Sequence, residues 1–157
     1  WRIGYLAIHD PKKRLIDVRD GIERLLRSRL CASTPAQIGY LAGLDSDRTW
    51  MKSYSDKVVR QRDLCVRRIS DIDGLEVQSA GGAFYMFVRL TDDKWSNNDK
   101  EFVLQLLHEE HVLVVHGSGF SPELGAGRFR IVFLPDVDVL DEAFNRIERF
   151  LIRHREV

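Results

Sequence analysis

Arginine is the residue type with the clearest chemical potential in this sequence, because two arginines interrupt apolar segments. Arg130 lies within the segment 129–134, and Arg2 lies within the segment 1–8, close to Gly4. A guanidinium binds a carboxylate or phosphate through two parallel hydrogen bonds, and an uncompensated charge in an apolar strand is costly. Arg130 is therefore a candidate for binding a ligand carboxylate and Arg2 for binding a phosphate. The alternatives are structural: either side chain faces solvent on an alternating strand, or a buried carboxylate pairs with Arg130.

Two other motifs have less specific chemistry. The segment 108–111 reads His-Glu-Glu-His, but its histidines are three positions apart, whereas the zinc-protease motif places them four apart. We therefore expect no metal site and interpret this segment as a solvent-exposed helix end. Gly117-Ser118-Gly119 lacks the third glycine of a nucleotide-binding loop and is interpreted as a tight turn.

The two cysteines, Cys31 and Cys65, are far apart and belong to no metal-binding pattern. We interpret both as buried free thiols, which are typical of the reducing cytoplasm.

Composition narrows the class of protein. The 157 residues include 24 basic and 24 acidic side chains, so the formal net charge is zero, which argues against a nucleic-acid-binding domain. No apolar run approaches the roughly 20 residues of a membrane-spanning helix, so no membrane partner is expected. The sequence does not begin with Met and starts on an apolar, strand-like segment. We therefore expect it to be part of a longer protein.

Hydrophobic periodicity predicts which elements position these residues. Helices are expected over about 15–30, 36–42 and 46–72, after Asn98 in a capping box with Glu101, and through 140–151. Strands are expected at 1–8, from 75, and over 84–90, 112–115 and 129–134.

The predicted fold class is α/β, with an α+β small domain in which helices pack on a small, mostly antiparallel sheet. Residues 1–45 are expected to form the end of one domain, 46–72 a long connecting helix, and 73–157 a small carboxy-terminal domain.

Five segments in this order resemble the class I and II aminotransferases of pyridoxal-phosphate fold type I, and the alanine and aspartate aminotransferase-like members in particular. The segments are Trp1-Arg2-Ile3-Gly4-Tyr5, Ser33-Thr34-Pro35-Ala36-Gln37, Gly82-Ala83-Phe84-Tyr85, Val114-Val115-His116-Gly117-Ser118-Gly119-Phe120 and Phe129-Arg130-Ile131-Val132-Phe133-Leu134-Pro135.

The resemblance implies roles for three residues. Arg2 would bind the phosphate of pyridoxal 5'-phosphate, Arg130 would bind the α-carboxylate of the substrate, and Phe84 would line the substrate pocket. It further implies amino acid and 2-oxo acid substrates, a homodimer, and residues 1–45 as the tail of the large pyridoxal-phosphate-binding domain.

The resemblance also implies what this chain lacks. The family's Schiff-base lysine falls a few residues before the position of Trp1, so no catalytic residue is expected here, and the chain alone is expected to be inactive. His116 stands where proline is commoner in the family. One alternative is a non-catalytic aminotransferase-like binding or regulatory module, and another is an unrelated α/β domain with coincidental motifs.

Overall fold

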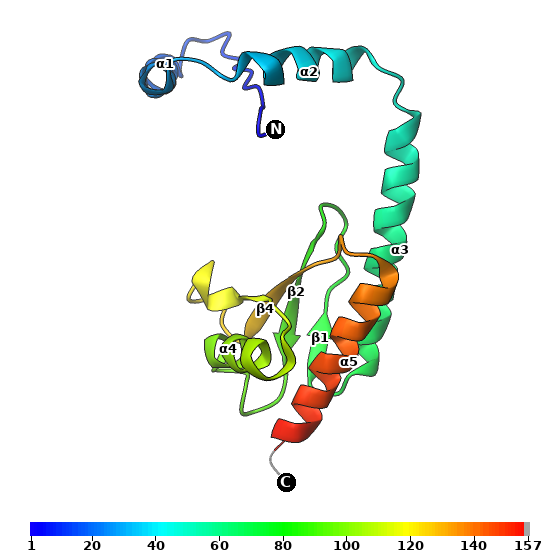
Figure 1. The fold of residues 1–157 in the computed structure, drawn as a ribbon. Helices are drawn as coiled ribbons and strands as arrows, with labels where there is room; N and C mark the ends of the chain where they lie inside the picture. The colour runs from blue at the N-terminus through cyan, green and yellow to red at the C-terminus, as the bar shows by residue number, and fades with distance from the viewer. Residues whose placement is uncertain (156–157) are drawn as a thin grey trace. The chain divides into compact units, whose positions relative to one another are not determined.

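Two helices provide the regular structure at the start of the chain, in a computed structural model that describes residues 1–155. They are α1 (Ile16–Arg29) and α2 (Thr34–Asp45), shown in Figure 1. The Asp10 carboxylate accepts hydrogen bonds from the backbone N–H groups of Arg14 at 2.9 Å and Leu15 at 2.7 Å, which orders the entry to α1. Pro35 lies in the first turn of α2, where its fixed φ favours helix initiation.

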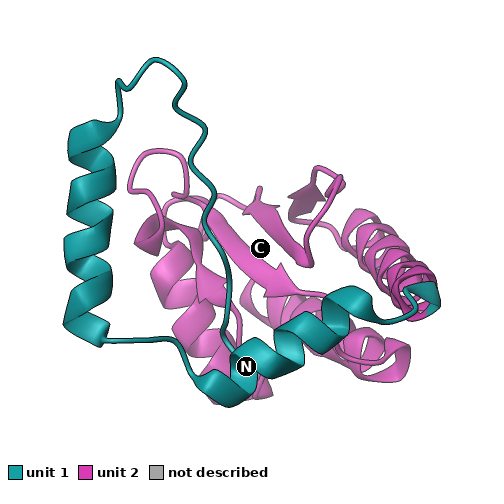
Figure 2. Cartoon of the chain, turned by 90° about the horizontal axis from the view of Figure 1, so that it is seen from above, with its two compact units in different colours: residues 1–49 teal, residues 50–157 magenta. Residues whose placement is uncertain are grey.

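The strand predicted over residues 1–8 is wrong, because these residues have no regular secondary structure. A strand is stabilised when a neighbouring strand satisfies its backbone N–H and C=O groups, and no residue of 1–49 provides one. Residues 1–49 form the first of two compact units (Figure 2), and within them only Ala36 is buried.

The second unit begins at Trp50 and contains a four-stranded sheet. The strand order is β1-β2-β4-β3 and every pairing is antiparallel, which confirms the predicted fold class. The remaining elements are α3 (Thr49–Asp71), β1 (Leu75–Val77), β2 (Tyr85–Leu90), α4 (Asp99–Glu110), β3 (Val115–His116), the 3₁₀ turn η1 (Gly117–Gly119), β4 (Arg128–Val132) and α5 (Val137–His154).

The sheet has one buried face and one open face, because side chains alternate along each strand. Met86 and Val88 of β2 and Phe129 of β4 face the core. Phe87 and Arg130 face the other way and lie directly opposite each other in the β2–β4 register. We call this second surface the open face. Its β2 and β4 residues are Tyr85, Phe87, Arg89, Arg128, Arg130 and Val132.

An aromatic cluster fills the core between the sheet and its helices. Phe102 of α4 lies 5.1 Å from Phe129 and 5.5 Å from Phe150 between ring centroids, and Trp95 packs 5.6 Å from both Phe102 and Phe150. All four side chains are buried. Burial of several large aromatic side chains at close ring distances gives this unit a core of its own.

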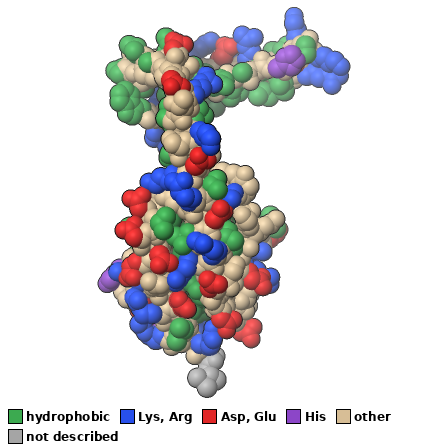
Figure 3. Space-filling model, turned by 90° about the vertical axis from the view of Figure 1, so that its right-hand side faces the viewer, with side chains coloured by type: hydrophobic (Ala, Val, Ile, Leu, Met, Phe, Trp, Pro, Cys, Tyr) green, Lys and Arg blue, Asp and Glu red, His purple; other side chains and the backbone are tan. Residues whose placement is uncertain are grey.

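Polar contacts join α3 to the chain segment that carries α5, and the two helices run side by side (Figure 1). The buried Gln61 amide donates to the carbonyl oxygens of Leu134 at 3.0 Å and Pro135 at 2.6 Å. Arg68 binds Asn145 at 2.7 Å and pairs with acidic residues of α5. Figure 3 shows acidic and basic side chains interspersed over this unit.

Several local expectations need correction. The capping box at Asn98 does not form: the Asn98 side chain makes no capping hydrogen bond, and its Nδ2 donates to the Lys94 carbonyl. The segment 108–111 is more than a solvent-exposed helix end, since Glu110 is buried and pairs with Arg149 and Arg153, each at 3.0 Å. The strand expected over 112–115 is reduced to β3.

The two cysteines differ in environment. Cys31 is exposed, contrary to the expectation that both thiols are buried, whereas Cys65 is fully buried in α3. Burial raises the pKa of the Cys65 thiol to about 12. Both are free thiols.

None of the helices in residues 1–155 has the combination of length and apolar character needed to cross a bilayer.

Candidate functional site

The structure places Arg130 on β4, between β2 and β3, with its side chain on the open face. Its guanidinium carbon lies 4.6 Å from the ring centroid of Tyr85 and 4.4 Å from that of Phe120. Its Nε is buried and has no hydrogen-bond partner among residues 1–155. Within residues 1–155 no carboxylate comes within 4.0 Å of the Arg130 guanidinium, so the buried-carboxylate alternative from the sequence does not hold.

Two aromatic rings hold the Arg130 guanidinium. Tyr85 comes from β2, and Phe120 follows η1, where its ring also meets Phe87 edge-on at 5.4 Å. A cation held against ring faces is stabilised electrostatically while its N–H edges stay free to donate. Arg130 is therefore a preformed cationic group that lacks an anionic partner among the described residues, and its geometry suits a ligand carboxylate.

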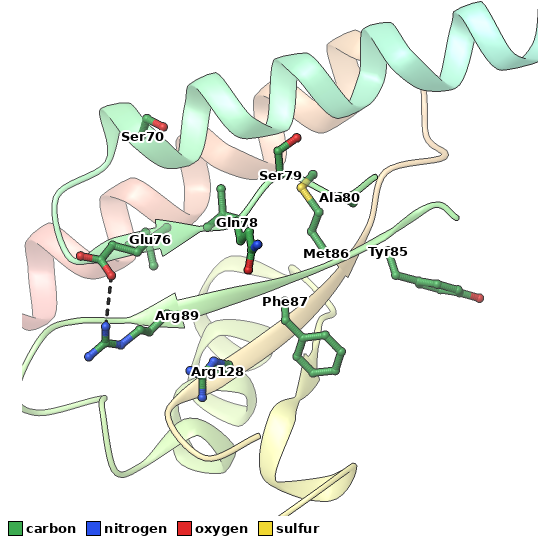
Figure 4. Close-up of a pocket in the computed structure, with 12 residues that line it drawn as sticks. Ser70, Glu76, Gln78, Ser79, Ala80, Tyr85, Met86, Phe87, Arg89 and Arg128 are labelled. Atoms are coloured by element: carbon green, nitrogen blue, oxygen red, sulfur yellow. Dashed lines mark hydrogen bonds and ion pairs between the residues drawn. The ribbon is translucent and has the colours of Figure 1, made fainter. Parts of the chain in front are cut away.

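The other two arginines of the open face are already engaged. Arg89 pairs with Glu76 of β1 at 3.3 Å, as Figure 4 shows. Arg128 donates to the carbonyl oxygen of Leu124 at 2.8 Å. Both arginines line a groove of about 750 Å³ over β1 and β2. Arg130 thus differs from its neighbours in having no protein acceptor in the part of the chain that the structure describes.

The loop that carries Phe120 depends on glycine. Gly117 and Gly125 approach so closely that a Cβ on either one would collide with the backbone carbonyl oxygen of the other. A Cβ on Gly119 would lie 2.7 Å from Cε1 of the His116 ring. These glycines serve close backbone and ring packing, which agrees with the predicted tight turn rather than with a nucleotide-binding loop.

Side chains from two elements also hold this loop. Nδ1 of His116 accepts a hydrogen bond from the N–H of Gly119 at 3.1 Å and lies 3.0 Å from the Ser118 hydroxyl. Asp99, the first residue of α4, accepts a hydrogen bond from the Ser118 N–H at 2.8 Å. The Asp99 side chain is buried although it carries a carboxylate.

Phe84 occupies a different place from Arg130. It precedes β2, is half-buried against the core, and its carbonyl oxygen accepts a hydrogen bond from the Phe133 N–H at 3.1 Å. With Trp50 and Tyr54 of α3 it lines an apolar groove of about 490 Å³. The structure therefore brings Tyr85, rather than Phe84, into contact with Arg130.

Arg2 lies in the first unit, exposed and with a φ of 55°. A positive φ is uncommon for a residue with a side chain. No described carboxylate forms an ion pair with Arg2, so its guanidinium is available for an anion. No set of three metal-ligating side chains occurs within residues 1–155.

Sequence reasoning did not assign roles to Tyr85, Phe120 or Asp99. Tyr85 and Phe120 belong to recognised motifs, so the signal for them existed. Asp99 lies in a predicted helix start, and nothing in the sequence connects it to a loop about twenty residues away.

The comparison with protein families gives one match, to "Aminotransferase class I and II", over residues 1–147. A glutamate-pyruvate aminotransferase AlaA of Haemophilus influenzae is 34% identical over 163 residues, which cover 99% of this chain and 39% of the relative. An alanine aminotransferase of Mycobacterium tuberculosis strain H37Rv is 31% identical over 159 residues, with 99% and 37% covered. The chain thus spans about two fifths of the length of these relatives.

Solved structures show the same similarity. An alanine aminotransferase from Pyrococcus furiosus superimposes with a TM-score of 0.83 at 46% identity, covering 92% of this chain and 36% of that one. An aminotransferase from Escherichia coli gives a TM-score of 0.82 at 31% identity, covering 94% and 37%.

Proposed function

We propose, since the chain belongs to the class I and II aminotransferase family, that the whole protein transfers an amino group between an amino acid and a 2-oxo acid. The observation that carries this proposal is the Arg130 guanidinium, held between the rings of Tyr85 and Phe120 with no anionic partner among the described residues. Every amino acid and 2-oxo acid presents a carboxylate that such a group can bind.

Arg130 binds and orients the substrate in this proposal. Two N–H groups of a guanidinium fix the plane of a carboxylate as well as its position, which an ammonium cannot do. The ligand supplies the counter-charge that no residue among 1–155 provides to Arg130. The role of Phe84 in lining the substrate pocket remains a prediction, and Tyr85 and Phe120 are the residues that hold Arg130.

The proposed cofactor is pyridoxal 5'-phosphate, as the family implies. Its phosphate suits Arg2, whose guanidinium is exposed and has no ion-pair partner in the described part of the chain. When bound, pyridoxal phosphate supplies an electron sink for the substrate carbon that loses its proton. This chain contributes cofactor and substrate binding, and we assign the proton transfers to none of its residues.

The organisation of the whole protein is part of the proposal. Residues 1–45 form the tail of the large cofactor-binding domain, 46–72 the connecting helix and 73–157 the small domain of a homodimer. The relatives named above act, by their names, on alanine, glutamate and pyruvate, so alanine with 2-oxoglutarate is the substrate pair to test first. The two free thiols support a location in the cytoplasm.

The test replaces Arg130 in the whole protein and follows pyruvate formation from alanine and 2-oxoglutarate. Losing two charge-assisted hydrogen bonds costs about 3–4 kcal/mol, so R130A should lower kcat/KM by about 10²–10³-fold. R130K should recover part of this loss, because it restores the charge without the planar fork.

R89A provides the matched control, since it removes a guanidinium from the same face of the neighbouring strand, where Glu76 already pairs with it. It should leave kcat/KM within about twofold of the original value. Equal activities of R130A and the unchanged protein would reject the carboxylate-binding role. A folded whole protein that transaminates no amino acid would instead favour the non-catalytic binding module.

A further inference from the structure

We infer that Asp99 is a positioning residue for the substrate-binding arginine: its carboxylate holds the loop 116–120 so that Phe120 packs on the Arg130 guanidinium. The inference rests on the proposed function, because it concerns the same carboxylate site. Asp99 is in α4, which packs on the core face of the sheet through Phe102, and its described hydrogen bond goes to the loop rather than to Arg130.

The Asp99 carboxylate is buried and hydrogen-bonded. Its side chain is 6% exposed, and its Oδ2 accepts the Ser118 N–H at 2.8 Å. A buried carboxylate is costly unless hydrogen bonds compensate it. The start of α4 gives a further favourable field, because helix N-termini carry partial positive charge. The carboxylate is therefore fixed in place and presents a rigid acceptor to the loop.

Three successive backbone N–H groups of the loop have fixed acceptors. Ser118 donates to Asp99, Gly119 donates to Nδ1 of His116 at 3.1 Å, and Phe120 donates to the carbonyl oxygen of Gly117 at 2.9 Å. Only the first acceptor comes from outside the loop. Asp99 therefore anchors the loop to the body of the unit, whereas the other two hydrogen bonds shape it internally.

His116 completes this arrangement through Nδ1 of its ring, which accepts the hydrogen bond from the Gly119 N–H. The Ser118 hydroxyl lies 3.0 Å from the same nitrogen. Nδ1 of His116 lies 3.9 Å from Asp99, so the ring and the carboxylate both converge on Ser118.

The loop contacts the arginine through Phe120. Phe120 follows Gly119 directly, and its ring lies 4.4 Å from the Arg130 guanidinium carbon. Phe120 is half-exposed, so little packing besides Arg130 and Phe87 fixes its ring. Loss of the Asp99 anchor should free the loop, remove one of the two rings from Arg130 and let the guanidinium sample orientations that do not match a carboxylate.

A capping role in α4 does not account for the Asp99 geometry. Its carboxylate points to a loop residue nineteen positions later instead of to the first turn of its own helix, and the N-cap residue Asn98 makes no capping hydrogen bond either. Glu101 is the other acidic residue of the first turn and is exposed, and its one hydrogen bond within residues 1–155 comes from Gln105. E101A therefore removes the same charge from the same turn without touching the loop.

The experiment compares D99A, D99N and E101A in the whole protein, with alanine and 2-oxoglutarate as substrates. D99A loses one hydrogen bond to a charged acceptor. It should therefore raise the KM values of both substrates about tenfold, while kcat stays within about twofold. D99N keeps an acceptor oxygen for the Ser118 N–H and should stay within about twofold of the original KM, as should E101A.

A second readout is independent of activity. Hydrogen exchange of the backbone amides of residues 116–121 should be faster in D99A and unchanged in E101A, because only the first variant loses the Ser118 acceptor. F120L provides a variant that removes the half-exposed ring and leaves Asp99 in place, so it should fold. It should raise KM to a similar extent as D99A, with normal exchange at Ser118.

The outcomes separate this inference from the proposed function. Unchanged KM values in both D99A and F120L, in a protein that transaminates normally, would overturn the positioning role and leave the proposed function intact. A fall in kcat alone, proportional to the loss of folded protein, would show that Asp99 is merely structural. An unsubstituted protein without transaminase activity would overturn both proposals.

Discussion

Residues 1–49 and the residues from Trp50 onward contain similar apolar side chains but bury them to very different extents. In the first unit, Leu25 is 73% exposed and Leu26 is 64% exposed, although both belong to the apolar stripe of α1. In the second unit, Phe102 and Phe150 are completely buried in one continuous core. The two units in Figure 2 therefore differ in whether they contain a core of their own.

The comparison shows that a segment can have the apolar periodicity of a helix without containing the residues that would bury its apolar stripe. The stripe of α1 is regular enough to predict a helix, yet no residue among 1–49 covers it. Isolated helices of this length are marginal in water and gain most of their stability from packing. The exposed stripe of α1 supports the proposal that residues 1–45 are the tail of a larger domain.

The largest expected effect comes from separating the two units. A protein of residues 50–157 should unfold cooperatively in urea, because its core lies within it. A peptide of residues 1–49 should show weak helical circular dichroism and no cooperative transition, because α1 and α2 lack a buried face. A cooperative transition of the peptide alone would contradict the comparison.

Thiol reactivity tests the same comparison in the intact chain. Cys31 should react with a thiol reagent at pH 8 at the rate of an unfolded cysteine, since it is exposed. Cys65 should react at least about 10³-fold more slowly, because reaching it requires unfolding of a core whose stability is expected to be about 5 kcal/mol or more. Its pKa of about 12 further lowers the thiolate fraction.

Guanidinium chloride provides the control for this measurement. Once the chain is unfolded, both cysteines should react at the same rate. Rapid labelling of both thiols in the native chain would show that the second unit does not protect Cys65, and slow labelling of both would show that residues 1–49 cover Cys31.

Much of the fold could be predicted because its signals are local. The strand-like pattern of apolar residues predicted β2 and β4, and the helical spacing of apolar residues predicted α3 and α5, to within a few residues. The strand expected at 1–8 failed because pairing depends on a neighbour that the segment itself does not specify. The capping box at Asn98 failed because the Asn98 and Glu101 side chains bind Lys94 and Gln105 instead of each other's backbone N–H groups.

The site was predictable only in part. A charge in an apolar strand identified Arg130 as the candidate, since its energetic cost can be recognised from composition alone. Its environment could not be predicted, because Tyr85 and Phe120 reach it from separate parts of the chain through the β2–β4 register and the η1 loop. The contact of Asp99 with the loop likewise depends on tertiary structure.

Two single substitutions, one in each unit, test the same difference in burial and should have smaller effects than separating the units. F102A should lower the free energy of unfolding of the second unit by about 3–5 kcal/mol, because it leaves a cavity among buried aromatic rings. L26A removes an apolar side chain of α1 that is 64% exposed and should change stability by no more than about 0.5 kcal/mol.

Urea titration of the 157-residue chain measures the F102A effect by tryptophan fluorescence, in which Trp95 should change most because Trp1 and Trp50 are already exposed. Helical circular dichroism follows L26A. A loss of stability in L26A as large as that in F102A would mean that the apolar stripe of α1 is buried. A negligible loss of stability in F102A would mean that the aromatic cluster contributes little to the stability of the second unit.

The smallest effect concerns a charged contact at the edge of the second unit. A hydrogen bond from His154, followed by one from Arg153, keeps the pKa of the Glu109 carboxyl below its usual range. A lowered folded-state pKa means that the carboxylate stabilises the fold fully above the unfolded-state pKa, about 4.3. That contribution is lost as the pH falls through the folded-state pKa.

E109Q should therefore be slightly less stable than the unchanged chain at pH 7, and the difference in urea midpoint should shrink as the pH falls below about 4. Because Glu109 is exposed, salt should reduce the difference as well. E101Q is the matched control: Glu101 lies on the same helix, and its only described contact is the uncharged Gln105 amide. The difference should depend more strongly on pH in E109Q than in E101Q. An equal pH dependence in both variants would mean that the pairing with His154 and Arg153 is not its source.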